Sequence, residues 1–446
     1  MIMQNPLKEM VIKRQNGIFC GIPSFCCANK IVIEAILSQA QRFGDTPLIE
    51  ATSNQVNQDG GYMDMTPQDF TDYVYHIADK LGISREKIYL GGDHMGPLPW
   101  VGLPAAEAME KAKVLVSLCV KAGYKKIHLD TSMRLGDDSR TERLSDDVIA
   151  ERGAVLYQAC EEAYLELKKQ NPNEIHPVFV IGSEVPVPGG INEDEAEGME
   201  LTKPSDFEHT LMAYRKKFHE MGLDSAWEHI IAIVVQPGVE FGDDTIHHYN
   251  RADAMDLCNT LKKYPDIVFE GHSTDYQSPA SLKQMVEDGI AVIKVGPALT
   301  FALREGLFAL NMIEEELIDD PAKLSHFRDV LEHEMMEDPK NWNKYYFGSE
   351  KEQAIKRKYS FSDRSRYYMS RPAVETARKK LFENIDNLEI PLSMLKQYMP
   401  LQYIKVRDGK LSMKARELAK DSVVTLVEDY NYAVKYNYMI SGIFIR

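Results

Sequence analysis

The chain has 446 residues, with 68 acidic against 52 basic side chains and a formal net charge of −16. This charge disfavours nucleic acids and anionic membrane surfaces as main partners, although a few local Lys or Arg side chains could still hold one anionic group. Apolar residues make up 44% of the chain, enough for a sizeable core. The length suits one large domain with an appendage, or two domains.

The sequence carries no sign of export or membrane insertion. The first residues, MIMQNPLKEMVIKRQNG, lack the apolar stretch of a signal peptide, and no run of about 18 apolar residues follows. None of the six cysteines forms a CxxC pair, which favours free thiols in a reducing compartment. We therefore expect a cytoplasmic protein with neither membrane nor nucleic acid as a partner.

Short apolar runs alternate with amphipathic stretches eight times along the chain. The predicted strands cover residues 17–26, 46–52, 87–93, 126–130, 177–185, 229–236, 267–272 and 291–295. The predicted helices cover residues 30–43, a stretch that begins at Thr66-Pro67, and residues 104–123, 145–169, 205–222, 250–264, 279–288 and 297–316. At Thr66-Pro67 the hydroxyl is expected at the N-cap and the proline at the first helical position.

Eight βα units whose strands are apolar on both faces predict an α/β protein with a closed (β/α)8 TIM barrel. The alternative is a doubly wound open sheet, which usually has a glycine-rich phosphate turn after its first strand, and GIPSFCCAN is not such a turn. After about residue 320 the alternation stops. We expect residues 1–320 to form the barrel and residues 321–446 a helical C-terminal extension packed on it.

Polar side chains gather where seven of the predicted strands end, or within them. The residues concerned are Glu50, Asn54, Gln55, Asp93, His94, His128, Asp130, Glu184, Gln236, His272, Ser273, Asp275 and Lys294. In a parallel barrel the carboxyl ends of the strands form the catalytic face. This distribution therefore predicts a convergent polar site.

His94 and His272 are candidate ligands of one divalent metal ion, with Glu184 supplying an oxygen. Imidazole suits zinc, manganese, nickel or cobalt. Either histidine taken alone could equally be a buried structural residue. Asp93, Asp130 and Glu184 are the candidate general acids or bases; the alternative role of Asp93 is to cap the following helix.

Three further residues of the strands allow two interpretations each. His128 lies two residues before Asp130 and so shares its face of the strand, either as a substrate-binding side chain or as a buried core residue. Glu50 either contacts substrate or forms a structural ion pair. Lys294 places a charge within an apolar strand. It could act as an electrophile, form a Schiff base or pair with an acidic side chain.

The remaining candidates are expected to bind substrate. Asn54 and Gln55 suit a hydroxyl-rich ligand or hydrogen bonds within their own loop, and Gln236, Ser273 and Asp275 follow later strands. Arg364, within SDRSRYY, could cover the barrel mouth and touch a phosphate or hydroxyl groups, or could lie at a solvated surface or interface.

Seven motifs carry a resemblance to a known family: LIEATSNQVNQDGGYMDMTPQDF, YLGGDHMGP, KIHLDTSM, IGSEVPVPGG, IAIVVQPGVEF, EGHSTDYQ and IKVGPALTFALRE. Together with IPLSMLKQYMP they are similar to the Z-subunit family of class II D-tagatose-1,6-bisphosphate aldolase, over nearly the whole chain. The resemblance implies a (β/α)8 barrel. The family was once described as tagatose-6-phosphate kinases, but this sequence has no GxxxxGK[ST] loop or kinase loop set.

This family in turn resembles the catalytic class II aldolases. By that resemblance Asp93-His94 is an acid/base and ligand pair, His272 a second ligand and Glu184 the acidic residue between them. The likeness has departures. Gln236 stands where those enzymes have another ligand histidine, and their phosphate-holding loops are replaced by Ser273-Thr-Asp275-Tyr276 and by Lys294-Val-Gly-Pro297.

These departures favour metal-dependent C4 epimerisation between fructose and tagatose by retro-aldol and aldol steps. One alternative is a non-catalytic subunit that stabilises a separate catalytic aldolase chain. The other is the bisphosphate aldolase itself, with Lys294, Arg304 and Arg364 holding phosphates. The expected partners are a ketohexose or its phosphate, further copies of the chain in a homo-oligomer and, for the subunit alternative, a catalytic aldolase chain.

Overall fold

A computed structural model of the chain describes residues 5–183 and 200–435. Eight parallel strands close into a barrel in the order β1-β10-β9-β6-β5-β4-β3-β2, which confirms the predicted fold class. The barrel strands are β1 (Ile22–Cys26), β2 (Leu48–Thr52), β3 (Tyr89–Met95), β4 (Lys126–Leu129), β5 (Val178–Ile181), β6 (Ile230–Val235), β9 (Val268–Gly271) and β10 (Ile290–Val295).

Each strand leads into a helix, and all of these helices except the last, α10, lie on the outside of the barrel. These helices are α2 (Lys30–Phe43), α3 (Pro67–Lys80), α4 (Ala105–Lys121), α5 (Asp146–Gln170), α7 (Pro204–Glu220), α8 (Met255–Leu261), α9 (Pro279–Glu287) and α10 (Pro297–Leu317). Thr66 caps α3 in a reciprocal capping box with Asp69, and Pro67 stands at the first position, as predicted. Phe179 and Ile181, which alternate with Val178 and Val180, belong to the large apolar core that the helices share.

Several boundaries differ from the prediction. The first strand begins at Ile22 rather than residue 17, because Gly17 has a positive φ that ends α1 and the chain turns before the strand. The third strand continues to Met95, and the helix expected over residues 250–264 is the shorter α8. The end of the predicted fifth strand, residues 184–185, lies outside the described residues.

Helix α1 (Pro6–Gln15) was not predicted. Its buried Leu7, Met10 and Val11 belong to an apolar cluster with strand residues such as Val180 and Val234. Asn5, just before the helix, donates hydrogen bonds to the carbonyl oxygens of residues 125 and 176, at the starts of β4 and β5. The helix therefore closes the amino-terminal end of the barrel, opposite the end where polar side chains gather.

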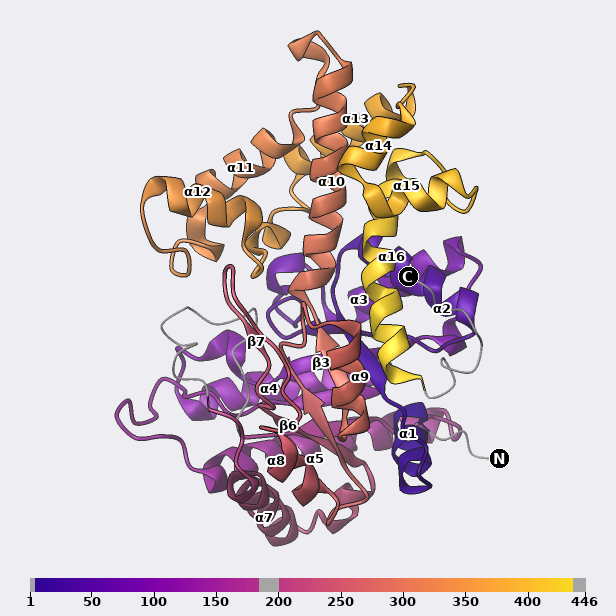
Figure 1. Cartoon of the computed structure of the whole chain (residues 1–446). Helices are drawn as coiled ribbons and strands as arrows, with labels where there is room; N and C mark the ends of the chain where they lie inside the picture. Colours follow the sequence, from indigo (N-terminus) through magenta and orange to yellow (C-terminus); the bar gives the residue numbers. More distant parts are fainter. Residues whose placement is uncertain (1–4, 184–199, 436–446) are drawn as a thin grey trace.

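The chain beyond β10 leaves the barrel and returns to it. Helix α10 extends away from the strands toward α11 (Phe327–Glu337), α13 (Pro372–Asp386), α14 (Leu392–Tyr398) and α15 (Pro400–Arg407), and α16 (Ala415–Val434) runs back beside it (Figure 1). Helix α16 packs against α2 and α9 as well as α10. The N–H of Gly21 donates to the carbonyl of Val434 at 3.1 Å. Helix α16 thus occupies the place of the eighth outer helix, between the helices that follow β9 and β1.

Residues 321–435 are helical with short connections, as expected, and include α12 (Glu350–Tyr359) and the short helix η7 (Arg364–Tyr367). The division into a barrel of residues 1–320 and an extension of residues 321–446 stays a prediction. The hairpin β7–β8 (Glu240–Phe241 and Ile246–His247), which was not predicted, is tied to this part, since Phe361 N–H donates to Asp243 O at 2.8 Å. Within the described residues, none of the helices is long and apolar enough to cross a membrane.

Candidate metal centre

The end of β3 carries two adjacent side chains that both reach the barrel interior. Neighbouring strand residues normally point to opposite faces. His94, however, has a φ of 48°, and the register with β4 shifts between Gly92 and Met95. This local twist turns Asp93 and His94 toward the same centre. A left-handed conformation at a non-glycine residue carries strain, and such strain is typical of functional sites.

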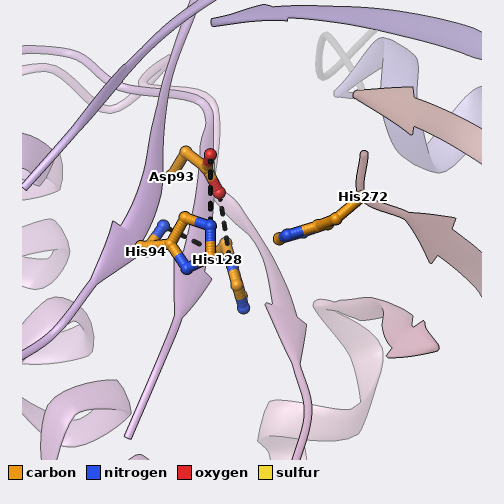
Figure 2. A group of neighbouring side chains, drawn as sticks. All are labelled: Asp93, His94, His128 and His272. Atoms are coloured by element: carbon orange, nitrogen blue, oxygen red, sulfur yellow. Dashed lines mark hydrogen bonds and ion pairs between the residues drawn. The ribbon is translucent and has the colours of Figure 1, made fainter. Parts of the chain in front are cut away.

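Asp93, His94, His128 and His272 form a buried group whose potential ligand atoms all lie within 4.8 Å of one another. The three ring centroids are 4.9–5.1 Å apart in every pair. In Figure 2, Asp93, His94 and His128 are joined by hydrogen bonds and ion pairs, and His272 approaches them from the other side. Strands β3 and β4 supply three of these side chains, and His272 follows directly after β9.

Each imidazole has one nitrogen held by another group. His94 Nδ1 lies 2.7 Å from Asp130 Oδ2, and His272 Nε2 lies 2.9 Å from Glu270 Oε1. A carboxylate on one ring nitrogen fixes the tautomer and makes the other nitrogen a better metal ligand. The arrangement therefore leaves Nε2 of His94 and Nδ1 of His272 available.

His128 follows the same pattern. Its Nδ1 is 3.1 Å from Asp93 Oδ1 and 3.3 Å from the backbone nitrogen of His94. Its Nε2 is buried and has no hydrogen-bond partner among the described residues. An orphaned buried imidazole nitrogen is costly unless it binds something. Three imidazoles beside one carboxylate form a donor set that fits a divalent transition ion.

The buried surroundings shift the pKa values of these groups in different directions. Burial lowers the pKa of His272 to about 3, so its ring is neutral at neutral pH, the form that binds metals. Burial also acts against protonation of His94, but the Asp93 and Asp130 carboxylates outweigh it and raise the pKa of that ring. Burial favours the neutral form of Asp93 and so acts to raise its pKa. The charges of His94 and Lys294 outweigh burial and hold this pKa well below the usual range.

A buried ionic network lies beside the histidines. The Lys294 ammonium is 2.6 Å from Glu50 Oε2 and 2.7 Å from Asp93 Oδ1. Lys126 is 3.0 Å from Glu50 and 2.7 Å from Glu270. The network reaches His272 through Glu270 and His128 through Asp93, so it holds the carboxylates that orient the rings. The sequence assigned no role to Lys126 or to Glu270, although each is a charge inside an apolar strand, as Lys294 is.

A cavity of about 290 Å³ opens next to this centre. Asp93, His94, His272 and Lys294 line one part of it. The other predicted residues that line it are Asn54, Gln55, Ser273, Asp275 and Arg364. The structure therefore brings nine of the predicted site residues to one cavity, from β-strand ends and from the C-terminal helices.

Four predicted residues do not line the cavity. Glu50 is fully buried in the ionic network, as the ion-pair interpretation had it. His128 is buried in the histidine cluster. Asp130 binds His94 through Oδ2, while its Oδ1 accepts from the N–H and hydroxyl of Ser132.

The fourth, Gln236, uses its side-chain oxygen to accept the N–H groups of Gly238 and Val239 in its own turn. The substrate contact expected of Gln236 stays a prediction. Glu184 lies outside the described residues. Its expected roles as ligand and acid/base stay predictions.

Residues 7–435 match the family model described as "D-tagatose-1,6-bisphosphate aldolase subunit GatZ/KbaZ-like". The chain belongs to the GatZ/KbaZ-like family. A solved relative, described as a probable tagatose 6 phosphate kinase from Sinorhizobium meliloti 1021, is 42% identical, with a TM-score of 0.83. The match covers 93% of this chain and 100% of that one.

More distant structures include the YdjI aldolase from Escherichia coli K12, at 11% identity over 86% of this chain and 98% of that one, with a TM-score of 0.40. A fructose-bisphosphate aldolase from Campylobacter jejuni matches at 14% identity over 86% and 94%, with a TM-score of 0.41. Likeness of this degree does not bear on chemistry. Membership of the GatZ/KbaZ-like family, in contrast, relates this chain to tagatose-bisphosphate aldolase.

Proposed function

We propose that this GatZ/KbaZ-like protein is a divalent-metal-dependent enzyme that epimerises a ketohexose or its phosphate at C4, interconverting the fructose and tagatose configurations. The observation that supports the proposal is the buried group of Asp93, His94, His128 and His272 beside the cavity. A complete donor set with oriented rings is more than a scaffold needs, because buried polar clusters cost stability unless they are satisfied.

His94, His128 and His272 would hold the metal, with Glu184 as a further proposed ligand. Zinc, manganese, nickel or cobalt would suit these donors. The ion would supply Lewis acidity toward the ketose carbonyl and the neighbouring hydroxyl. Asp130 and Glu270 act as positioning residues, since each binds the nitrogen of a histidine that faces away from the metal.

Asp93 is the proposed base. Its Oδ1 is bound by Lys294 at 2.7 Å and by His128 at 3.1 Å, which leaves Oδ2 to accept a proton. The low pKa of this carboxylate keeps it ionised, and it lines the cavity. It would take the proton of the C4 hydroxyl. Lys294 then compensates the change of charge at Asp93.

Loss of that proton lets the C3–C4 bond break. The oxygen at C4 becomes an aldehyde, and the electron pair of the broken bond stays on the three-carbon ketone fragment as its enediolate. If the aldehyde turns over within the cavity, C3 re-attacks its other face and Asp93 returns the proton to the oxygen at C4. Asn54, Gln55 and Ser273 line the cavity and would hold the hydroxyl groups during this turn.

The second candidate is a stabilising subunit of a catalytic tagatose-bisphosphate aldolase, or that aldolase itself. The family's description as an aldolase subunit favours it. In either case we expect a cytoplasmic homo-oligomer, a location supported by six cysteines that are all unpaired.

The deciding experiment uses the full chain, stripped with a chelator and reloaded with zinc, manganese, nickel or cobalt. Fructose and fructose 6-phosphate are offered separately, and the tagatose isomers are measured by chromatography. We expect product only with metal, and none from His94→Ala or His272→Ala. Absence of product with every metal and both substrates would contradict the epimerase proposal and favour the role as an aldolase subunit.

A further inference from the structure

Arg364, on η7 in the C-terminal part, lines the same cavity as the histidines. Its side chain is buried, with 4% of the residue exposed. Its guanidinium stacks on the Tyr345 ring, 3.2 Å from the centroid, and its one described hydrogen bond is from Nη1 to the carbonyl of Asn341 at 3.4 Å. Nε is buried without a partner. Among the described residues, Arg364 forms no ion pair.

Arg366 lines the cavity from the same short helix. It donates to the carbonyls of Ser362 and Asp363 and, from Nη2, to the Tyr367 hydroxyl at 2.9 Å. These acceptors are neutral, and within the described ranges no carboxylate lies at ion-pair distance from its guanidinium. Two cationic side chains therefore share one cavity without a direct counterion, in a protein whose net charge is −16.

Other arginines nearby are already neutralised. Arg378, which also lines the cavity, donates to Glu375 at 3.1 Å. Arg304 binds Asp363 at 2.8 Å. The contrast singles out the buried Arg364 and the half-buried Arg366, because a charge that is withdrawn from water without a counterion is costly unless a ligand supplies one.

The usual phosphate position of a TIM barrel, at the loops after the last two strands, is filled from within the chain. Asp275 Oδ1 accepts the N–H of Gly296 at 3.0 Å and that of Ala298 at 2.8 Å, at the start of α10. A carboxylate thus takes the amides that would cradle a phosphate. An anionic group entering this cavity must find its donors elsewhere.

We propose that Arg364 and Arg366 form an anion subsite that binds the phosphate of a ketohexose phosphate, while the carbonyl end of the same substrate lies at the histidine cluster. This inference rests on the proposed function and names its substrate class. Guanidinium groups bind phosphate through two parallel hydrogen bonds, and these are strong where water is excluded.

The test is calorimetric titration of the full chain with inorganic phosphate and, separately, with fructose 6-phosphate and fructose. We compare wild type with Arg364→Gln and Arg366→Gln, and use Arg378→Gln as the matched control from the same cavity. Each of the first two changes should weaken phosphate and fructose 6-phosphate binding by about tenfold or more. Fructose binding should change little, and the control should keep wild-type affinity for all three.

Arg364→Lys keeps the positive charge but loses the two-pronged donor, so an intermediate affinity is expected. Circular dichroism and thermal unfolding of every variant separate lost binding from lost structure. The subsite is overturned if wild type gives no heat with phosphate, or if all four variants bind it equally.

The two proposals fail differently, because phosphate binding is measured without metal or turnover. Metal-dependent conversion of fructose by a protein that binds no phosphate would sink the subsite and keep the enzyme. Arginine-dependent phosphate binding without turnover of any substrate would keep the subsite and sink the epimerase.

Discussion

The ammonium of Lys294 on β10 lies 2.7 Å from the carboxylate of Asp93 on β3. The two strands are not neighbours in the barrel, so this contact crosses its interior. Nearby acidic side chains, Asp93 first, raise the pKa of Lys294 well above its usual range against the effect of burial. Lys294 is therefore a charged ion-pair partner at neutral pH, not a free amine that could attack a carbonyl.

Replacing Lys294 by Met should lower the free energy of unfolding by about 3–5 kcal/mol, because it leaves Asp93 and Glu50 as uncompensated buried charges. The measurement is urea unfolding followed by circular dichroism. Lys111→Met, at an exposed ion pair with Asp59, is the control and should change stability by less than about 1 kcal/mol. An equal, small effect of both substitutions would contradict the buried network.

Metal content should depend on all three histidines. His94→Ala, His128→Ala and His272→Ala should each bind markedly less than one zinc or manganese ion per chain, because each removes one donor atom. Inductively coupled plasma mass spectrometry after dialysis gives the stoichiometry. His209→Ala, exposed on α7, should match wild type. Full occupancy in His128→Ala would restrict the ligand set to the two histidines that sequence reasoning named.

Asp130 should act through His94. Asp130→Asn should weaken metal binding by about 10–100-fold, because the amide holds the ring less firmly and makes its free nitrogen less basic. Competition with a fluorescent chelator measures this affinity. Under saturating metal the variant should recover most of its activity, whereas a direct acid/base role for Asp130 would leave it inactive.

Stability should fall in mild acid partly because of His229. Burial and then the charge of His176, whose ring stacks on it at 3.4 Å, lower the pKa of His229 to about 4 from an ordinary 6.5. The folded state thus binds fewer protons than the unfolded state between these values, so stability rises with pH across that window.

His229→Gln removes this dependence. Relative to wild type, the variant should gain thermal stability as the pH falls from 7 to 5, while His209→Gln should track wild type throughout. Differential scanning fluorimetry at several pH values gives the comparison. A constant difference between His229→Gln and wild type across this range would refute the assignment.

The sequence predicted the barrel well because its strands are buried on both faces and so appear as continuous apolar runs. Eight such runs that alternate with helices are compatible with only a few strand topologies, because the crossover connections between parallel strands are short and right-handed. The sequence also predicted that Asp93, His94 and His272 lie near the ends of their strands and converge, and all three side chains line one cavity. For His128, spacing showed that it shares a face with Asp130 but not that it would meet rings from β3 and β9.

What the sequence did not show depends on contacts across the barrel. Lys126 and Glu270 lie 144 positions apart, and their ion pair needs the closed sheet. Helix α1 buries Leu7, Met10 and Val11 against residues of several barrel strands, a contact that exists only in the folded chain. The turn of Gln236 was equally hidden, since its hydrogen bonds to Gly238 and Val239 depend on local backbone geometry.

The return of α16 to the barrel has a consequence for how the protein is made. The first and last outer positions of the barrel meet only when Val434 contacts Gly21, directly before β1. During synthesis all eight strands therefore leave the ribosome before α16 can cover the seam between α9 and α2. Until α16 is made, apolar surface at the seam of the barrel stays exposed. The contact that closes the seam joins residues far apart in the sequence, so its loop-closure entropy cost is high and its formation is slow. A shortage of chaperones should harm this chain more than a barrel that closes with its own eighth helix.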